Sequence, residues 1–183
     1  WRGGMPGYQD VPNEHFHSRV ASYLETYIAR DVRATNDIEN VEPFVHFVGI
    51  MAALTAQEIN QDQLGREIDI AGATAKKWLA LLTQSYQWRS IPAYHGNAIK
   101  RIAKKHKGYF TDTGLACYLQ FISTPTALLS HPLRGALFET YMANTIQALL
   151  GALSFEPQLY HWRSNGGAEV DLVISFDNKL YPI

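Results

Sequence analysis

The chain has 183 residues, of which 46% are hydrophobic and 18% are charged, and its formal net charge is −1. This composition is typical of a globular protein and argues against intrinsic disorder. Because the net charge is close to zero, no global field attracts the chain to nucleic acid, and any such binding needs a local basic patch. The length permits one large domain or two small ones.

A single cysteine, Cys117, excludes a disulfide within the chain, and we expect a protein of the reducing cytoplasm. No apolar run approaches the roughly 20 residues that a membrane helix needs, so no membrane partner is expected. The chain has neither an initiator methionine nor a signal peptide, and it stops at Ile183 inside an expected strand. The sequence therefore predicts a piece of a longer protein.

The first expected elements are a loop and two helices. Glycine and proline dominate residues 1–12, whereas apolar residues recur at helical spacing between Asn13 and Val32. Residues 40–55 are apolar on most sides, so this second helix is expected to lie centrally, with Pro43 tolerated in its first turn. We expect residues 1–36 to form a loop, a helix and a linker from a preceding module.

Residues 57–86 predict a helix, a tight turn and a second helix, which is the layout of a helix-turn-helix. Asn60 is expected to cap the first helix, and Gly72 is expected in the turn, where a residue without Cβ is tolerated. The buried face of the second helix is predicted from four residues at helical spacing: Ala75, Leu79, Leu82 and Tyr86.

Two short strands complete a winged helix. Residues 88–94 contain Pro92 and favour an edge strand, and a turn signal follows at residues 95–97. A second strand is expected at residues 108–111, after which Asp112 caps a helix that runs to about residue 121. We therefore predict a winged-helix domain over residues 37–122.

Residues 122–133 carry two prolines and are predicted to connect two domains. An amphipathic helix is expected at 135–150, followed by strands at 158–163, 169–176 and 180–183. The predicted fold class is α+β and mostly α, a winged helix-turn-helix followed by an endonuclease-like helix and β-sheet. The second unit, residues 123–183, is expected to be an α/β domain that is incomplete at its C-terminus.

The first candidate site is basic. A handful of cations on one wing is enough to bind phosphate, with a strong dependence on salt. The alternatives are a solvated charged face or a protein-interaction surface, and the scarcity of arginine, the commonest reader of guanine, indicates weak sequence specificity. The nucleic-acid-binding candidates are Lys76, Lys77, Lys100, Arg101, Lys104, Lys105 and Lys107.

The second candidate site consists of Glu139 on the amphipathic helix and Asp171 in a strand after a Gly-Gly turn. This is the arrangement of a restriction-endonuclease-like core, in which two carboxylates hold a divalent metal and a lysine of a following Glu-x-Lys positions or activates water. Glu169 lies two residues from Asp171 and shares its strand face. Arg163 on the preceding strand is able to neutralise these carboxylates, which is the structural alternative.

Other site classes find no support in the sequence. No phosphate-binding Gly-x-x-x-x-Gly-Lys-Ser/Thr run is present, and the histidines and the cysteine lack zinc spacing. We expect no catalytic residue and no cofactor in this chain by itself.

Several motifs together resemble a domain of unknown function that forms the C-terminal half of bacterial and archaeal AAA-type ATPases. The most specific is Lys104-x-x-Lys107-x-Tyr109-Phe110-x-Asp112-x-Gly114-Leu115. Further matching segments are residues 23–31, 64–86, 135–139, 160–163 and 169–171. The resemblance covers nearly the whole chain.

This resemblance implies a P-loop ATPase module in the same parent protein, with ATP and Mg²⁺ as its cofactors. It implies metal positions at Glu139 and Asp171 and a Glu-x-Lys beyond Ile183. Without that lysine and the ATPase, the chain is expected to be inactive in both reactions. The leading hypothesis is a non-catalytic winged-helix module that binds DNA or regulates the ATPase; the alternatives are a metal-dependent nuclease in the full-length protein and a module that binds a protein partner.

Overall fold

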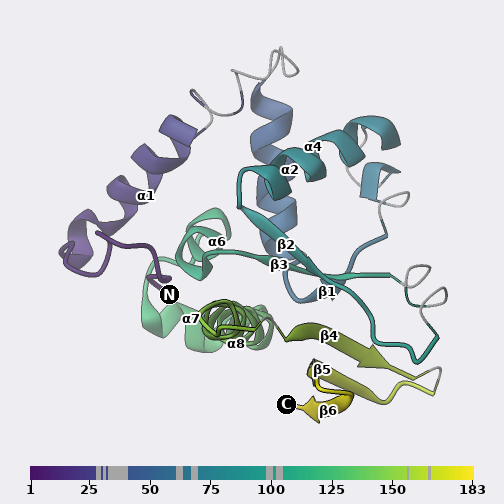
Figure 1. The fold of residues 1–183 in the computed structure, drawn as a ribbon. Helices are drawn as coiled ribbons and strands as arrows, with labels where there is room; N and C mark the ends of the chain where they lie inside the picture. The colour runs from purple at the N-terminus through teal and green to yellow at the C-terminus, as the bar shows by residue number, and fades with distance from the viewer. Residues whose placement is uncertain are drawn as a thin grey trace.

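The structure is a computed structural model that describes residues 1–27, 30, 32, 41–60, 64–66, 70–97, 101, 105–155, 157–164 and 166–183. Helices and two small antiparallel sheets confirm the predicted α+β class (Figure 1). The elements are α1 (Asn13–Tyr27), α2 (Val41–Ala53), β1 (Gln57–Glu58), α4 (Gly72–Gln84), β2 (Trp88–Ile91), β3 (Lys107–Phe110), α6 (Thr113–Leu119), α7 (Pro125–Ser130), α8 (Arg134–Gly151), β4 (Gln158–Arg163), β5 (Glu169–Phe176) and β6 (Lys179–Pro182). No helix among these described residues is long and apolar enough to cross a membrane.

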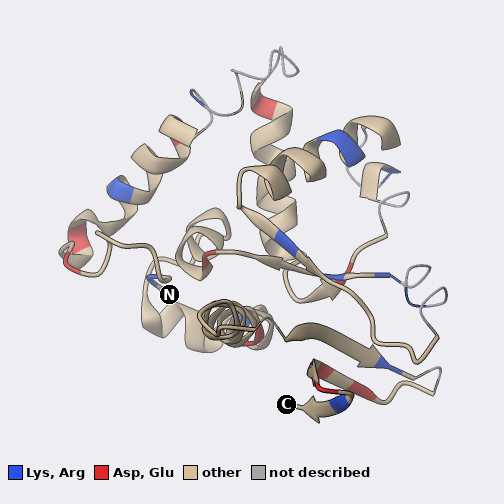
Figure 2. Cartoon of the chain, viewed as in Figure 1, with Lys and Arg blue, Asp and Glu red and all other residues tan. Residues whose placement is uncertain are grey.

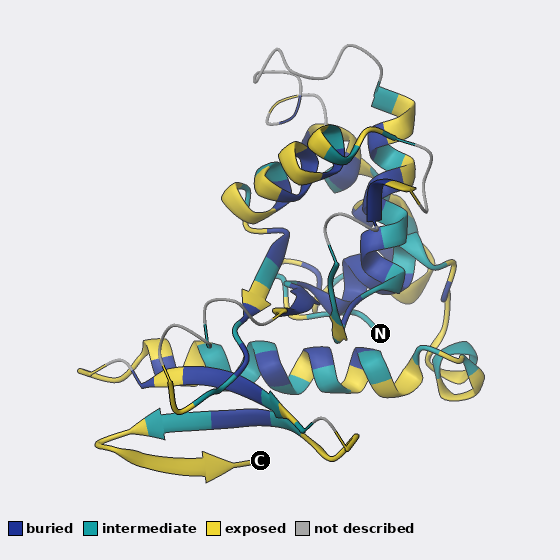
Figure 3. Cartoon of the chain, turned by 90° about the vertical axis from the view of Figure 1, so that its right-hand side faces the viewer, coloured by how far each residue is buried: buried dark blue, intermediate teal, exposed yellow. Residues whose placement is uncertain are grey.

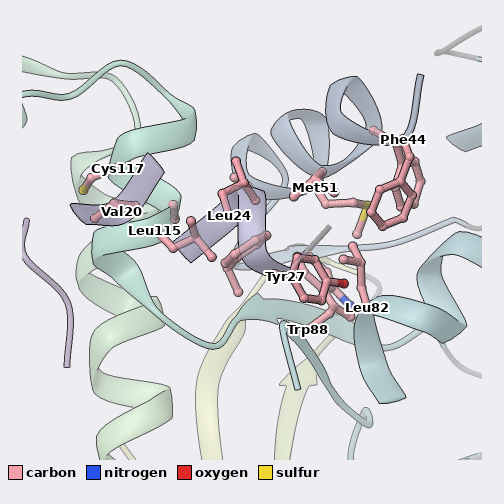
Figure 4. Packing of buried hydrophobic residues seen from close by; sticks show 14 of the residues in the cluster. Val20, Leu24, Tyr27, Phe44, Met51, Leu82, Trp88, Leu115 and Cys117 are labelled. Carbon is pink, nitrogen blue, oxygen red and sulfur yellow. The ribbon is translucent and has the colours of Figure 1, made fainter. Parts of the chain in front are cut away.

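A large apolar core lies among α1, α2, α4, α6 and β2 (Figure 4). Helix α2 is central, as predicted, because Phe44, Phe47 and Met51 are all completely buried. Helix α4 packs onto α2 through Trp78, whose ring meets those of Phe44 and Phe47 at centroid distances of 5.5 Å. Edge-to-face pairs of this kind stabilise a core beyond the area that they bury.

The helix-turn-helix differs in part from the prediction. Residues 57 and 58 form strand β1, because they pair with Gly108 and Lys107 of β3. Gly72 begins α4 instead of lying in the turn before it. Tyr86 is 82% exposed, because it lies beyond the end of α4 with φ = 60°. The first helix is described only at residues 64–66, so the cap predicted at Asn60 lies at the border of the described residues.

Strand β3 is the middle strand of the first sheet, which has the order β1-β3-β2. The predicted edge strand is therefore confirmed as β2, which ends at Ile91 just before Pro92. The next residues cross to the second sheet, where Ala93 bridges His161 in parallel. Tyr94 N–H donates to the His161 carbonyl at 2.6 Å, and His161 N–H donates to the Pro92 carbonyl at 3.0 Å. These bonds join the two sheets.

Helix α8 and the second sheet, of order β4-β5-β6, follow the predicted segments closely. A smaller core forms where α8 meets both sheets, with Ile91, Tyr109, Ala143, Leu159 and Leu172 among its members. Figure 3 shows buried and exposed residues alternating along α8, whereas β6 is exposed throughout. The predicted connector contains a short helix, α7, with a proline in its first turn.

Asp112 is the N-cap of α6, as predicted, and it also holds the N-terminal segment in place. One carboxylate oxygen accepts from Leu115 N–H at 2.8 Å, and the other accepts from Gly4 N–H at 2.8 Å. A Cβ at Gly114 would lie 2.2 Å from the Arg2 carbonyl oxygen. Any larger residue at position 114 would therefore clash with the N-terminal segment. Two motif residues, Asp112 and Gly114, therefore hold residues 2–4 against the start of α6.

We predict that Gly108→Ala destabilises the fold. A Cβ at this position would lie 1.9 Å from Cζ2 of Trp88, and that ring is almost fully buried. The ring must move within a packed core, at a cost of about 1–3 kcal/mol in the free energy of unfolding. Chemical denaturation measures the loss. Gly135→Ala is the matched control, because nothing lies within 4 Å of its added Cβ and alanine favours α8; equal stabilities for the two variants would contradict the prediction.

Candidate functional site: a lysine between two carboxylates

Three charged side chains from different elements meet between the two sheets. The Lys107 ammonium of β3 lies 2.6 Å from Oε1 of Glu139 on α8 and 2.7 Å from Oδ1 of Asp171 on β5. The lysine side chain is 10% exposed, that of Glu139 is 20% exposed and that of Asp171 is 46% exposed. One buried ammonium thus bridges two carboxylates that lie far apart in the sequence.

Lys107 and Tyr109 lie two positions apart in β3 and therefore share a face, and both side chains bond to Glu139 on α8. The Tyr109 hydroxyl donates to the same Oε1 of Glu139 at 2.6 Å, and its ring is completely buried. Burial, together with this bond to Glu139, raises the pKa of Tyr109 far above its ordinary value, so it stays a neutral donor. Burial lowers the pKa of Lys107, but its bonds to Asp171 and Glu139 outweigh that effect and leave the pKa raised.

An irregularity in the second sheet accompanies Asp171. Tyr160 pairs with Val173 and Trp162 pairs with Val170, so one residue of β4 faces two residues of β5, Asp171 and Leu172. Such bulges redirect a side chain at the point where they interrupt the ladder. Leu172 and Val173 are adjacent and both buried, whereas a regular strand would place them on opposite faces of the sheet.

The cluster opens into a polar cavity of about 420 Å³. Glu58, Lys105, Glu169 and Arg163 line it in addition to the three clustered residues. Arg163 Nε lies 3.7 Å from Glu169 Oε2, and both side chains are about half exposed. Of the two carboxylates that Arg163 was expected to neutralise, it therefore pairs with Glu169. The cavity wall thus contains carboxylates and cations in nearly equal number.

Glu139 and Asp171 supply part of the ligand set that a divalent cation needs. Mg²⁺ is commonly held by one or two carboxylates, with water and phosphate oxygens as its remaining ligands. Among the described residues, no group of three or more His, Cys, Asp or Glu side chains is placed to hold a metal ion. Glu139 and Asp171 would therefore supply two ligands, and Lys107 now contacts the same two oxygen atoms.

Of the other basic candidates that the structure describes, Lys105 lines the cavity beside this cluster, whereas Lys76, Lys77 and Arg101 lie elsewhere. Lys76 and Lys77 are exposed on α4, away from the start of β3 (Figure 2). Arg101 packs against the rings of Tyr94 and Tyr160 at 5.5 and 5.1 Å and donates to the Tyr160 hydroxyl at 2.9 Å. Lys105 is exposed. Lys100 and Lys104 lie outside the described residues.

Three residues near the cluster were not predicted as site residues: Glu58, Tyr109 and His161. Tyr109 lies two positions after Lys107 in the most specific motif, which is the signal that would have placed both on one strand face. Nothing in the sequence distinguishes His161 from the other histidines. Its Nε2 lies 3.2 Å from the Lys105 carbonyl oxygen, and its ring is buried beside the junction of the sheets.

We predict that acid destabilises the protein through His161. Burial lowers the pKa of His161, although the bond to the Lys105 carbonyl and the nearby Glu58 oppose that effect. The unfolded chain therefore binds this proton more readily, and stability is lost as the pH falls from about 6.5 towards the lower folded pKa. For one proton, the free energy of unfolding changes by at most about 1.4 kcal/mol per pH unit.

Unfolding of the wild type and of His161→Gln, measured at about pH 7.5 and about pH 5, checks this prediction. Glutamine retains a donor for the Lys105 carbonyl but does not titrate. The wild type should lose more stability than the variant over this interval. Parallel losses in the two proteins would assign acid sensitivity to other groups.

Comparisons with known proteins place the chain among relatives of unknown function. The family model described as "Domain of unknown function (DUF8612)" matches residues 1–126, and the one described as "Domain of unknown function (DUF4143)" matches residues 134–183. No solved structure shows a significant match.

Two curated mycobacterial proteins are similar along almost the whole chain. They are "Uncharacterized protein Mb2031c" of Mycobacterium bovis and "Uncharacterized protein Rv2008c" of Mycobacterium tuberculosis, each 28% identical over 181 residues. The match covers 98% of this chain but only 40% of either relative. Since the first family model spans more than half of the sequence, the chain belongs to the DUF8612 family of domains of unknown function.

Proposed function

We propose that the chain joins a winged-helix module to an endonuclease-like unit, within a larger protein that acts on nucleic acid. Glu139 and Asp171 form the divalent-cation pair of that unit. The observation that carries the proposal is the convergence of these two carboxylates, one from a helix and one from a bulged strand, on a single positive charge. The cavity beside them offers room for a phosphodiester.

The residues around the pair suit this role. A divalent cation would bind Glu139 and Asp171 and would polarise a phosphodiester and its attacking water. Tyr109 orients Glu139 through its hydroxyl, as second-sphere donors commonly orient metal ligands. Arg163 and Lys105, at the cavity wall, are placed to bind phosphate oxygens.

The chain accounts for 40% of its curated relatives, and we propose that the remainder of the larger protein contains the ATPase, with ATP and Mg²⁺ as its cofactors. The chain by itself is then a non-catalytic module, because two carboxylates alone do not complete a nuclease site. Its domain division at residues 37 and 123 stays a prediction.

A cleavage assay on the larger protein with Mg²⁺ or Mn²⁺ tests the endonuclease proposal. Glu139→Ala and Asp171→Ala should each lower cleavage of duplex or single-stranded DNA about 10–100-fold or more, because each removes one of two metal ligands. Asp177→Asn is the matched control, because this exposed carboxylate lies in the turn after β5 and does not line the cavity. Cleavage by the wild type that survives both alanine substitutions would overturn the proposal.

A second candidate function, direct binding of nucleic acid by the winged helix, is favoured by the position of two lysines. Lys76 and Lys77 are exposed on α4, the second helix of the helix-turn-helix, whose opposite face is buried in the core. A helix in this position presents its outer side chains to a DNA groove in known helix-turn-helix proteins. Lys105 adds one exposed charge near β3.

We predict that Lys76→Glu and Lys77→Glu each weaken binding to duplex DNA. Each loss of a phosphate contact should reduce the slope of log affinity against log salt concentration by about 0.9. Fluorescence anisotropy over a salt series measures both quantities, and Lys179→Glu on exposed β6 controls for the change in net charge. Absence of wild-type binding even at low salt would remove this candidate.

A further inference from the structure

The Lys107 ammonium contacts the atoms that a divalent cation would need. It lies within 2.7 Å of one oxygen from each carboxylate, whereas Mg²⁺ binds such oxygens at about 2.0–2.1 Å. Two cations that share the same pair of oxygens would repel each other strongly in a half-buried site. Occupation by Lys107 and occupation by a metal ion are therefore mutually exclusive.

The backbone of Lys107 has little freedom to leave the site. β3 is paired on both sides, and the next residue, Gly108, lies directly against the Trp88 ring. Tyr109, one residue further, remains bonded to Glu139. A change at this site must therefore come from rotation of the flexible lysine side chain.

A second acceptor is within reach of that rotation. Glu58 of β1 is the direct cross-strand partner of Lys107. Directly opposed residues in an antiparallel pair have Cβ atoms about 4.5–5.5 Å apart on one face. Both residues line the same cavity, which has room for a displaced ammonium.

We propose that Lys107 is a gate for the cation site, a conclusion that rests on the proposed role of Glu139 and Asp171. In the closed state its ammonium neutralises both carboxylates and excludes a divalent cation. In the open state the ammonium turns to Glu58, and the two carboxylates accept the cation. Because Lys107 belongs to the winged-helix sheet, the gate makes metal loading depend on the module that precedes the carboxylates.

Manganese binding by the full 183-residue chain tests the gate without any need for catalysis. Electron paramagnetic resonance of free Mn²⁺ measures the binding, and circular dichroism checks the fold of each variant. Lys107→Met should bind Mn²⁺ at least about tenfold more tightly than the wild type, because no ammonium has to leave two charge-assisted hydrogen bonds. Adding Asp171→Asn to Lys107→Met should abolish this gain.

The outcomes separate the gate from the site itself. One outcome is that the wild type and Lys107→Met bind Mn²⁺ equally tightly, with binding lost when Asp171→Asn is added to either protein. That result would support the metal site and overturn the gate. No binding by either protein at millimolar Mn²⁺ would overturn both. If Lys107→Met does not fold, Glu58→Gln tests the same gate with the lysine in place: removal of the second acceptor should weaken Mn²⁺ binding, and unchanged or tighter binding would overturn the gate.

Discussion

The fold depends on strand β3, whose four residues are all buried and which separates two cores. Its Phe110 belongs to the helical core, and its Tyr109 belongs to the core formed with α8 and the second sheet. Alternation along one strand thus commits adjacent residues to different parts of the molecule. The face that meets α8 also carries Lys107, so the same strand that holds the two parts together brings a positive charge to Glu139 and Asp171.

The energetics of this ion cluster favour a functional reason for its presence. Desolvation of buried charges commonly cancels most of their mutual attraction, so an apolar replacement of similar volume is often as stable. Lys107 nevertheless lies where a polar cavity borders the smaller apolar core, which contains Ile91 and Leu159. A buried charge kept at this border has a desolvation cost that an apolar residue would not have, and such exceptions are expected at functional sites.

The sequence predicts the secondary elements well where local signals are strong. Asp112 caps its helix, and the boundaries of β4 and β5 coincide with those expected. The predicted edge strand forms as well, although it ends at Ile91 and does not include Pro92. Prediction failed where tertiary pairing decided the outcome. Residues 57–58 form a strand because they pair with residues 107–108 of β3, which lie far away in the sequence. The bulge at Asp171 likewise depends on the register of a neighbouring strand.

The basic run shows why charge in a sequence does not define a surface. Lys107 and Arg101 belong to one stretch of cations, yet the first lies between carboxylates and the second packs against two tyrosine rings. Lys107 and Tyr109 share a strand face because β3 begins at residue 107. The sequence pattern predicted a strand that begins at residue 108 and therefore left Lys107 outside it. The pairing of Lys107 with Glu139 and Asp171 then follows from topology, since α8 and β5 reach the strand from the far end of the chain. Lys107 of the first sheet thus ties the charge balance of the cluster to the packing of that sheet against α8 and the second sheet, and no local motif encodes this dependence.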